Sequence, residues 1–401
     1  MRVALLTVAL FFAFCYVAGS QNYEVTVTTI RVWVAVEGKA AGTLTKEDFD
    51  VYEDGKRMEP TCFERSQLQP SSEPAPPVDA TSTSAGGENE GMSDLRRKRI
   101  VLMVDQLNTT ENEYLFIKKK ILDFLDQMEG KSEVMLTGVP PYEEMTDFTK
   151  NFDEIRKKLE RLTASRDRDQ RATARRRDIR NTLETHRSDA MAIAHRLAME
   201  GKMEEEQEVL LVLDAIKSFQ KSLNKRDQQE HTVVIFISGG LNSHPGQKYV
   251  DMIPEGTPDD EAFRELQRGA NDFGRIMEQA IGSLNRDNVT VYTINTRGQV
   301  DPVDNITESD KKYAADQKKM SDYAKDTQEL LDKIAQDTGG LSYRNSLNFK
   351  RGFDAVLDDL DHQYLLCYVA PEHKEPGDYH KIKVTSRTKG IKVRYRAGYM
   401  D

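Results

Sequence analysis

Hydrophobic residues near the start of the chain follow the two-residue period of a β-strand. The segment "YEVTVTTIRVWVAVEG" (23–38) is rich in Val and Thr and partly alternates apolar with polar positions, which is typical of a strand. A second pattern, "GTLTKEDFDVYEDGKRMEPTCFE", follows at 42–64. It predicts a short strand over 49–52, a hairpin turn at Asp54-Gly55 and a returning strand over 58–63, which together make a small antiparallel β unit.

From residue 100 onwards, apolar runs alternate with segments of helical spacing. Buried strands that are separated by helices predict a parallel sheet with helices on both faces and right-handed crossovers. The expected strands cover 100–105, 133–139, 231–240 and 288–298, with short pieces at 145–149 and 341–344, and the expected helices cover 111–128, 151–163, 260–285, about 321–337 and 349–361.

The last forty residues return to strand patterns, "QYLLCYVAP", "GDYHKIKVTSR" and "GIKVRYRAGY", with the turns "EPGD" and "TKG" between them. Three antiparallel strands alone make a poor sandwich, but together with the N-terminal strands they can complete one. We therefore predict an α/β fold in which a doubly wound, mostly parallel sheet is inserted into a small β-sandwich built from both chain ends. The expected segments are an N-terminal β segment (21–65), a linker (66–95), the α/β domain (96–361) and a C-terminal β segment (362–401).

Three segments depart from these patterns. Residues 66–93 contain almost no large apolar side chain, so they cannot offset the entropy of ordering and are expected to be a disordered linker. The basic run at 96–99 is expected to be solvated at the start of the next strand. Within the α/β domain, residues 164–229 form a charged insertion, in which we expect two or more long helices, the second docking on the sheet. Its arginines stand at 166, 168, 171, 175, 176, 177, 180 and 187.

Charge and the first residues bear on location and partners. The chain of 401 residues has a formal net charge of −10, so it has no overall attraction to nucleic acid. The arginine-rich insertion could bind nucleic acid, but nearby glutamates offer partners within the chain, and we favour a salt-bridged helical arm. Arg2, an apolar stretch over 3–17 and the small residues at 18–20 predict a secretory signal cut before Gln21. An uncleaved anchor is the alternative, although about 16 apolar residues are short for a span. We expect an exported protein, periplasmic, in the cell envelope or extracellular, that meets a membrane only during export.

Two cysteines, Cys62 and Cys367, follow the predicted signal peptide. In an exported protein they could form a disulfide. The alternative is two buried thiols, because each lies in an apolar strand-like run and free cysteine packs well as a small apolar residue. The sequence contains no CxxC pair and no Cys/His cluster, so it does not predict a zinc site.

Six segments occur in the order and spacing of a bacterial exported family: "GTLTKEDFDVYEDGK", "VLMVDQLN", "VVIFISGGL", "VYTINTRG", "IAQDTGGLSYRN" and "QYLLCYVAP…GDYHKIKV…VRYRAGY". On these residues the chain resembles the VWFA-related domain proteins, best known from Acidobacteria. The resemblance covers nearly all of the chain after residue 20, except the linker and parts of the helical arm. It implies a von Willebrand factor A-like domain flanked by a split β segment, in proteins mostly of unknown role.

In a domain of this kind, ligands bind in a crevice beyond the carboxyl ends of the strands, here those ending at Asp105 and Ser238. The resemblance implies a metal-ion-dependent adhesion site, which holds Mg²⁺ with an Asp-x-Ser-x-Ser loop, a threonine and a second aspartate. Asp105 matches the first aspartate and Thr109 can replace the second serine, whereas Leu107 stands where the first serine belongs. The implied metal ligands are therefore Asp105, Thr109 and Ser238.

The rest of this ligand set is incomplete. Ser238 or Gly239 occupies the place of the third-loop aspartate, and the second-loop threonine has only Thr173 and Thr182 as weak candidates. One carboxylate with one or two hydroxyls is a poor cage for Mg²⁺, so we expect no cofactor, or a divalent cation bound weakly. The favoured interpretation is that Asp105 caps backbone N–H groups of the following loop, with Asn108 shaping the turn. Asp105, Asn108, Gly239 and Gly240 are the expected partner-binding crevice.

No catalytic residues are predicted. Ser238 follows a strand and precedes glycines, but it does not match G-x-S-x-G, and the positions of His231, His244 and His362 place none of them as its base. The leading hypothesis is an exported, non-catalytic protein-binding or adhesion module with a degenerate metal-ion-dependent adhesion site, whose protein ligand is unknown. One alternative is a hydrolase of unrecognised type that uses Ser238 or carboxylates of the crevice. The other is a structural scaffold that docks a partner through the helical arm.

Overall fold

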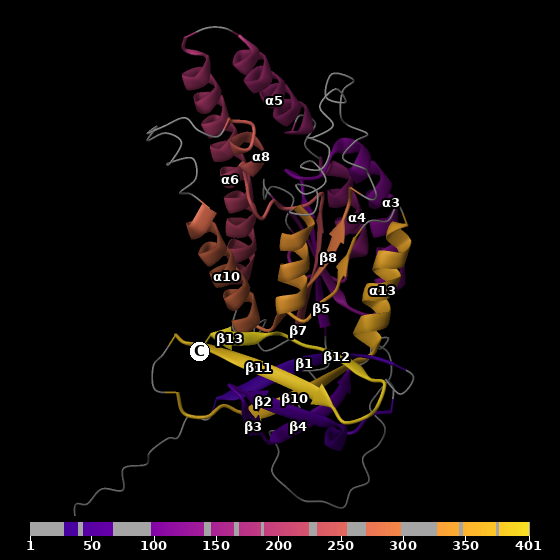
Figure 1. Cartoon of the computed structure of the whole chain (residues 1–401). Coiled ribbons are helices and arrows are strands. Elements are labelled where there is room, and N and C mark those ends of the chain that lie inside the picture. Colours follow the sequence, from indigo (N-terminus) through magenta and orange to yellow (C-terminus); the bar gives the residue numbers. More distant parts are fainter. Residues whose placement is uncertain are drawn as a thin grey trace, which may run out of the picture.

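The computed structural model describes residues 28–38, 43–66, 98–139, 146–163, 168–185, 188–223, 231–254, 270–297, 327–344, 348–373 and 377–400. Within this part of the chain, strands form one sheet of five strands and two sheets of four strands each. The two smaller sheets lie together at one end of the molecule, and the larger sheet with its helices lies beyond them (Figure 1). The predicted fold class, an α/β domain combined with a β-sandwich from both chain ends, is confirmed.

All strand pairs of the five-stranded sheet are parallel. The chain places its second strand on one side of the first and its third strand on the other side, so the winding direction reverses there. At such a switch point the loops after the two neighbouring strands diverge and leave a crevice beyond their carboxyl ends. Across the sheet the order is β6 (Glu133–Val139), β5 (Lys98–Asp105), β7 (His231–Ser238), β8 (Val289–Asn295) and β9 (Ser342–Tyr343).

Helices cover both faces of this sheet. Successive strand residues point to opposite faces, so Ile100 and Leu102 pack against one layer of helices while Val101 and Met103 pack against the other. Because both faces are buried, the strands are almost continuously apolar. The first layer contains α3 (Glu111–Met128), α4 (Phe152–Arg161) and α13 (Phe349–Asp361), and the second contains α6 (Ala190–Ser222), α10 (Ala270–Arg286) and the helix over 327–337.

The β-sandwich joins strands from the two ends of the chain. The first strand lies antiparallel beside a C-terminal strand, with Val32 opposite Leu366, and their inward side chains share one apolar core with the second sheet, including Val51 and Val384. One sheet has the order β12 (Lys392–Arg394), β1 (Thr29–Glu37), β10 (Gln363–Val369) and β4 (Pro60–Ser66), and the other has the order β13 (Gly398–Met400), β11 (Tyr379–Ser386), β2 (Phe49–Glu53) and β3 (Lys56–Met58).

The predicted hairpin turn at Asp54-Gly55 is present, and both residues have positive φ, 48° and 82°, as a two-residue turn of type I′ requires. The returning strand differs from the expectation. It divides after Met58, so that β3 pairs with β2 whereas β4 crosses to the other sheet and pairs with β10. Pro60 is the first residue of β4, and its missing N–H cannot continue a ladder, which favours a change of sheet at this point.

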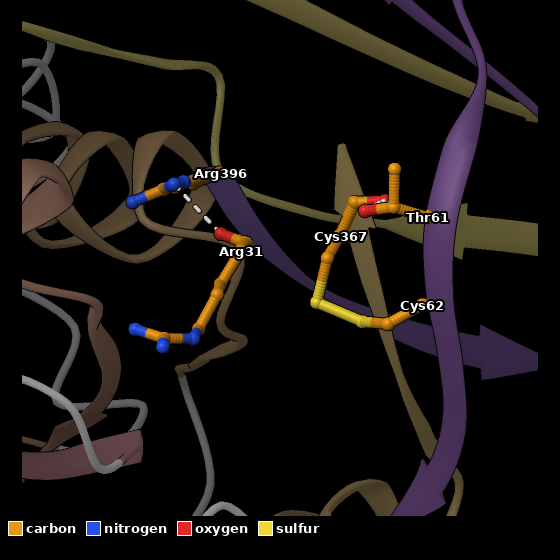
Figure 2. Close-up of a disulfide and its surroundings, with 5 residues drawn as sticks. All are labelled: Arg31, Thr61, Cys62, Cys367 and Arg396. Atoms are coloured by element: carbon orange, nitrogen blue, oxygen red, sulfur yellow. Dashed lines mark hydrogen bonds between the residues drawn. A yellow bond between two sulfur atoms is a disulfide. The ribbon is translucent and has the colours of Figure 1, made fainter. Parts of the chain in front are cut away.

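Cys62 and Cys367 form a disulfide between β4 and β10 (Figure 2). The two residues stand opposite each other in the strand register, and their Cα atoms are 4.8 Å apart. Beside them, the Thr61 hydroxyl donates a hydrogen bond to the Cys367 carbonyl at 3.3 Å. Of the two interpretations of these cysteines, the structure has the disulfide, which fits a protein of an oxidising compartment.

The sandwich meets the α/β body through buried polar and aromatic contacts. Trp33 of β1 stacks on His231 at the start of β7, with ring centroids 4.2 Å apart and ring planes within 8°. Burial holds the pKa of His231 well below its ordinary value, so the ring is neutral at this seam. Lys98 at the start of β5 is also buried, and its ammonium donates to the Leu360 carbonyl. The expectation of a solvated basic run is therefore wrong for Lys98.

Two arginines of the C-terminal segment complete this seam. Arg394 of β12 forms ion pairs with Glu37, at 3.1 Å, and with Asp359 of α13. Arg396 donates to the carbonyls of Asn285 and Arg31, the latter at 2.7 Å (Figure 2). These contacts show that the amino ends of the parallel strands face the sandwich. The carboxyl ends, where the crevice is expected, point away from it.

The charged insertion forms α5 (Arg168–Glu184) and α6, and α5 packs beside the first half of α6 in an arm that extends beyond the sheet (Figure 1). Arg175 of α5 forms ion pairs with Glu204, at 2.7 Å, and Glu200, at 3.6 Å, both on α6. The second half of α6 packs on the sheet through an apolar stripe that includes Val209 and Phe219. These contacts agree with a salt-bridged arm, and the absence of nucleic-acid binding stays a prediction.

Some expectations concern residues that the structure does not describe. The signal peptide (1–20) lies outside the described residues, and so does the linker (66–95) except for Ser66, which ends β4. The expected strand at 145–149 appears only as an isolated bridge between Thr149 and Val134. Among the described helices, none is both long and apolar enough to cross a membrane. The domain boundaries proposed from the sequence stay predictions.

Candidate functional site

Asp105 lies at the end of β5 with its carboxylate pointing into the protein. Oδ1 accepts hydrogen bonds from the backbone N–H groups of Leu107 and Asn108, both at 3.0 Å. Oδ2 accepts from Nδ2 of Asn108 and from the hydroxyl of Ser238, both at 2.7 Å. Asp105 has 0% exposure. The carboxylate therefore shapes the loop that follows β5 and ties this loop to the end of β7.

Two glycines let the loop after β7 approach the loop after β5. A Cβ atom on Gly239 would lie 1.9 Å from the Asn108 carbonyl oxygen, so a side chain here has no room. Gly240 has φ +116°, a conformation that favours glycine, and its N–H donates to the Ser238 hydroxyl at 3.1 Å. The structure thus brings together Asp105, Asn108, Gly239 and Gly240 of the predicted crevice, with the Ser238 hydroxyl bonded to both Asp105 and Gly240.

Helix α3 begins at the same edge of the sheet with a capping box. The Thr110 hydroxyl accepts from the Glu113 N–H at 3.4 Å, and Glu113 Oε2 accepts from the Thr110 N–H at 2.8 Å. The Thr296 hydroxyl, just after β8, also donates to Glu113 Oε2 at 3.3 Å. The ends of β5, β7 and β8 are therefore fixed to one another by side chains, which makes this edge a rigid surface.

A buried glutamate connects the segment after β7 to the helical arm. Glu205 of α6 accepts hydrogen bonds from Nδ2 of Asn242, at 3.2 Å, and from the Gly246 N–H, at 2.8 Å. It also forms an ion pair with Lys248. All three partners lie in the segment that follows β7, so this segment is held between the sheet edge and the arm.

The donor set does not fit a firmly held Mg²⁺. Magnesium prefers near-octahedral oxygen ligands, but each Asp105 oxygen already accepts two hydrogen bonds from the chain, and Leu107 offers no side-chain oxygen. Thr109 is buried, and its hydroxyl has no hydrogen-bond partner among the described residues. Thr173 and Thr182 form their hydrogen bonds within α5, with Arg176 and the Asp178 carbonyl. A cation here would have to displace the internal donors of Asp105.

Ser238 has no histidine beside it in the described contacts. It has 0% exposure, and its hydroxyl donates to Asp105. His231 lies at the opposite end of β7 against Trp33, His244 contacts the Ser243 hydroxyl, and His362 contacts the Asp358 carbonyl. A nucleophile needs a base within hydrogen-bond reach, so this geometry offers no support for the hydrolase alternative at Ser238.

Two large apolar side chains near the start of α3, the helix that follows β5, are exposed. Leu115 is 61% exposed and Phe116 is 72% exposed, and both lie in the first two turns of the helix that starts at Glu111. Exposed apolar residues that occur singly are ordinary, whereas contiguous exposed apolar patches are typical of interaction surfaces. We call Leu115 and Phe116 the α3 pair. On α6, Met203 in the arm and Leu211 in the half that packs on the sheet are also exposed.

No family model and no curated protein matches the chain. Among solved structures it is similar to proximal thread matrix protein 1 from the mussel byssus, with TM-score 0.30 and 10% identity over 70% of this chain and 49% of the mussel chain. A von Willebrand factor type A from Catenulispora acidiphila aligns with TM-score 0.30 and 10% identity over 76% of this chain and 67% of that chain. The matched region spans about half the length of the mussel protein. Membership of the VWFA-related family stays a prediction.

A second cluster was not predicted from the sequence. Glu53, His373 and His380 meet at one end of the sandwich, where their ligand atoms lie within 4.8 Å of one another. Glu53 is distant from both histidines in the chain, so only the pairing of the two chain ends brings them together. The available signal was weak: His373 and His380 flank the predicted turn "EPGD", and Glu53 precedes the predicted hairpin turn.

Proposed function

We propose that this protein is an exported, non-catalytic module that binds a protein partner at the carboxyl edge of its parallel sheet, without a bridging cation. The observation that carries this proposal is the α3 pair, two exposed apolar side chains near the start of the helix that follows β5, together with the Asp105 carboxylate, which is already satisfied internally. Protein interfaces are enriched in aromatic residues at their centre. The resemblance of six sequence segments to exported VWFA-related proteins agrees with export.

The crevice and the α3 pair differ in what they offer a partner. A cation-dependent adhesion site presents a metal whose open coordination position accepts a carboxylate, and this needs ligand oxygens directed outwards. The Asp105 carboxylate points inwards, so an Mg²⁺ ion that would bind a carboxylate of the partner lacks these ligand oxygens. Phe116 offers a large apolar surface that is now in water, and burying it against a partner would contribute roughly 2 kcal/mol. The expected partner therefore presents an apolar pocket to the start of α3.

The disulfide supports export, because such bonds persist in oxidising compartments. The predicted signal peptide at 1–20 agrees with it. Rigidity also favours a binding role: the ends of three strands are fixed by Asp105, Ser238 and Glu113, and a preorganised surface loses little conformational freedom on binding.

The test begins with a photo-crosslinking side chain at position 116 of the full-length exported protein, which identifies the partner. The purified partner is then titrated against the wild type and against the double variant Leu115→Ser/Phe116→Ser. We expect the affinity to fall at least about tenfold, and to be the same in metal-free buffer with and without added Mg²⁺. Affinity that requires Mg²⁺ and is lost in Asp105→Asn contradicts the proposal.

The scaffold alternative has its own observation. Met203 in the arm is 60% exposed and Leu211, in the half of α6 that packs on the sheet, is 42% exposed, so α6 also offers apolar contacts. The variant Met203→Ser/Leu211→Ser is the matched control, since it removes the same kind of surface from α6. If the α6 variant loses the partner while the α3 variant keeps it, docking through the arm is the correct function.

A further inference from the structure

One end of the β-sandwich holds three side chains with metal-binding atoms, far from the crevice. Glu53 is the last residue of β2, His380 lies in β11, and His373 lies in the segment after β10. Glu53 and His380 are buried, and His373 is partly buried. We propose that Glu53, His373 and His380 form a site for Zn²⁺, which holds the two chain ends together. This site is independent of the proposed partner binding.

The donor types select the metal. Two imidazoles and one carboxylate suit Zn²⁺ and neighbouring transition metals, whereas Mg²⁺ and Ca²⁺ prefer oxygen ligands throughout. Three protein ligands leave one tetrahedral position for a water molecule. Zn²⁺ is the redox-inert member of this group, which suits a protein that carries a disulfide in an oxidising compartment.

His380 is oriented by a carboxylate, as metal-binding histidines usually are. Its Nδ1 lies 2.8 Å from Oδ2 of Asp54. An ionised carboxylate can only accept, so Nδ1 carries the hydrogen, and in the neutral ring Nε2 carries the lone pair that a metal requires. Asp54 is itself held by the backbone N–H of Lys381, which donates to Oδ1 at 2.8 Å.

Glu53 is positioned just as firmly. Its Oε2 accepts hydrogen bonds from the hydroxyls of Tyr368, at 2.5 Å, and Tyr399, at 2.9 Å. Its Oε1 lies 3.0 Å from Nε2 of His373. One carboxylate oxygen is thus used for orientation while the other faces the histidine, the division of roles that a monodentate metal ligand requires.

Metal binding requires a limited rearrangement. Ligand atoms around a tetrahedral Zn²⁺ lie about 3.3 Å apart, given metal–ligand distances near 2.0 Å. The Glu53–His373 separation is already close to this value, and the widest separation in the cluster has to shorten by up to about 1.5 Å. The rings of His373 and His380 are stacked, with centroids 3.5 Å apart. Since a ring nitrogen binds a metal in the ring plane, the two rings must tilt apart, and the His373 proton must move from Nε2 to Nδ1.

The test is a calorimetric titration of ZnCl₂ into the metal-stripped, disulfide-bonded full-length protein. We expect one ion per chain. Loss of the partner that orients a metal ligand weakens binding about 10- to 100-fold. His373→Ala loses a ligand itself, so it should weaken Zn²⁺ binding by more than that. Asp54→Asn leaves all three ligands in place but changes the partner that orients His380. Its affinity for Zn²⁺ should be about 10- to 100-fold lower than that of the wild type. His362→Ala is the matched control, because His362 is a partly exposed histidine that contacts the Asp358 carbonyl, and it should bind like the wild type.

Co²⁺ gives a second readout, since tetrahedral coordination by nitrogen and oxygen produces visible absorption bands. These bands should appear in the wild type and in His362→Ala, and be absent in His373→Ala. The proposal is overturned if the wild type shows no saturable Zn²⁺ binding, or if His373→Ala binds Zn²⁺ as tightly as the wild type. Neither outcome bears on the proposed partner binding at the α3 pair, which lies at the other end of the molecule.

Discussion

The Asp105 carboxylate accepts hydrogen bonds from two backbone N–H groups, an amide and a hydroxyl, and so joins two strand ends through one buried charge. Asp105→Ala leaves all four donors without this acceptor. We expect the free energy of unfolding to fall by about 3 to 5 kcal/mol, measured by urea denaturation. Asp153→Ala on α4, whose side chain is largely exposed, is the control and should change stability by less than about 1 kcal/mol. A loss for Asp105→Ala as small as that of the control would mean that the network is not structural.

Lys98 should make stability depend on pH. Burial, against the opposing charges of Asp359 and Asp361, lowers its pKa from 10.5 to about 7. Between these values the unfolded chain keeps a proton that the folded chain has lost, so the free energy of unfolding rises with pH. The destabilisation caused by burying the charged Lys98 side chain is complete below about pH 7 and absent above about pH 10.5. We expect the free energy of unfolding of the wild type to rise, relative to that of Lys98→Met, by up to about 1.4 kcal/mol per pH unit. Urea denaturation of both proteins at pH 7 and pH 9 measures this difference. Parallel pH profiles would show that Lys98 keeps its ordinary pKa.

Among the elements, β4 and β10 depend on a covalent link. The Cys62–Cys367 disulfide spans 305 positions, so in the unfolded chain it closes a very long loop. Cys62→Ser/Cys367→Ser should lower the free energy of unfolding by about 2 to 5 kcal/mol. The measurement is urea denaturation of both proteins with and without a reducing agent. The wild type should approach the variant only under reduction, and equal stability of the two oxidised samples would contradict this expectation.

Local patterns predicted single elements well. The helix expected over 111–128 coincides with α3, because its apolar spacing is regular and Thr110 and Glu113 cap it. The strand expected over 133–139 coincides with β6. Such elements are decided by residues a few positions apart, which are visible in the sequence.

Other features depend on residues far apart in the chain and could not be predicted from local sequence patterns. The division of the returning strand into β3 and β4 follows from pairing with β10, about 300 positions away. Lys98 is buried because α13 and the sandwich close over the start of β5, which no local pattern reveals. The orientation of Asp105 could be proposed as one of two interpretations, but only the positions of Asn108 and Ser238 show how its oxygens are used. The cluster of Glu53, His373 and His380 could be predicted only from the strand register that brings the two chain ends together.

At the scale of the whole molecule, the two chain ends form one unit on which the α/β body rests (Figure 1). Removing 362–401 deletes β10 to β13, so β1 and β4 lose the strand between them, and the seam around Trp33 and His231 opens. We expect the shortened chain to lose its cooperative thermal unfolding transition and to aggregate, measured by calorimetry and size-exclusion chromatography. An unchanged transition would mean that the body folds without the sandwich.

The crevice, finally, is predicted to recognise its partner without a bound cation. Calorimetric titration of MgCl₂ into the metal-stripped wild type tests this most directly. The Asp105 oxygens are occupied by internal donors, so we expect no saturable heat. A saturable Mg²⁺ site with Kd below about 1 mM that disappears in Asp105→Asn would contradict the account.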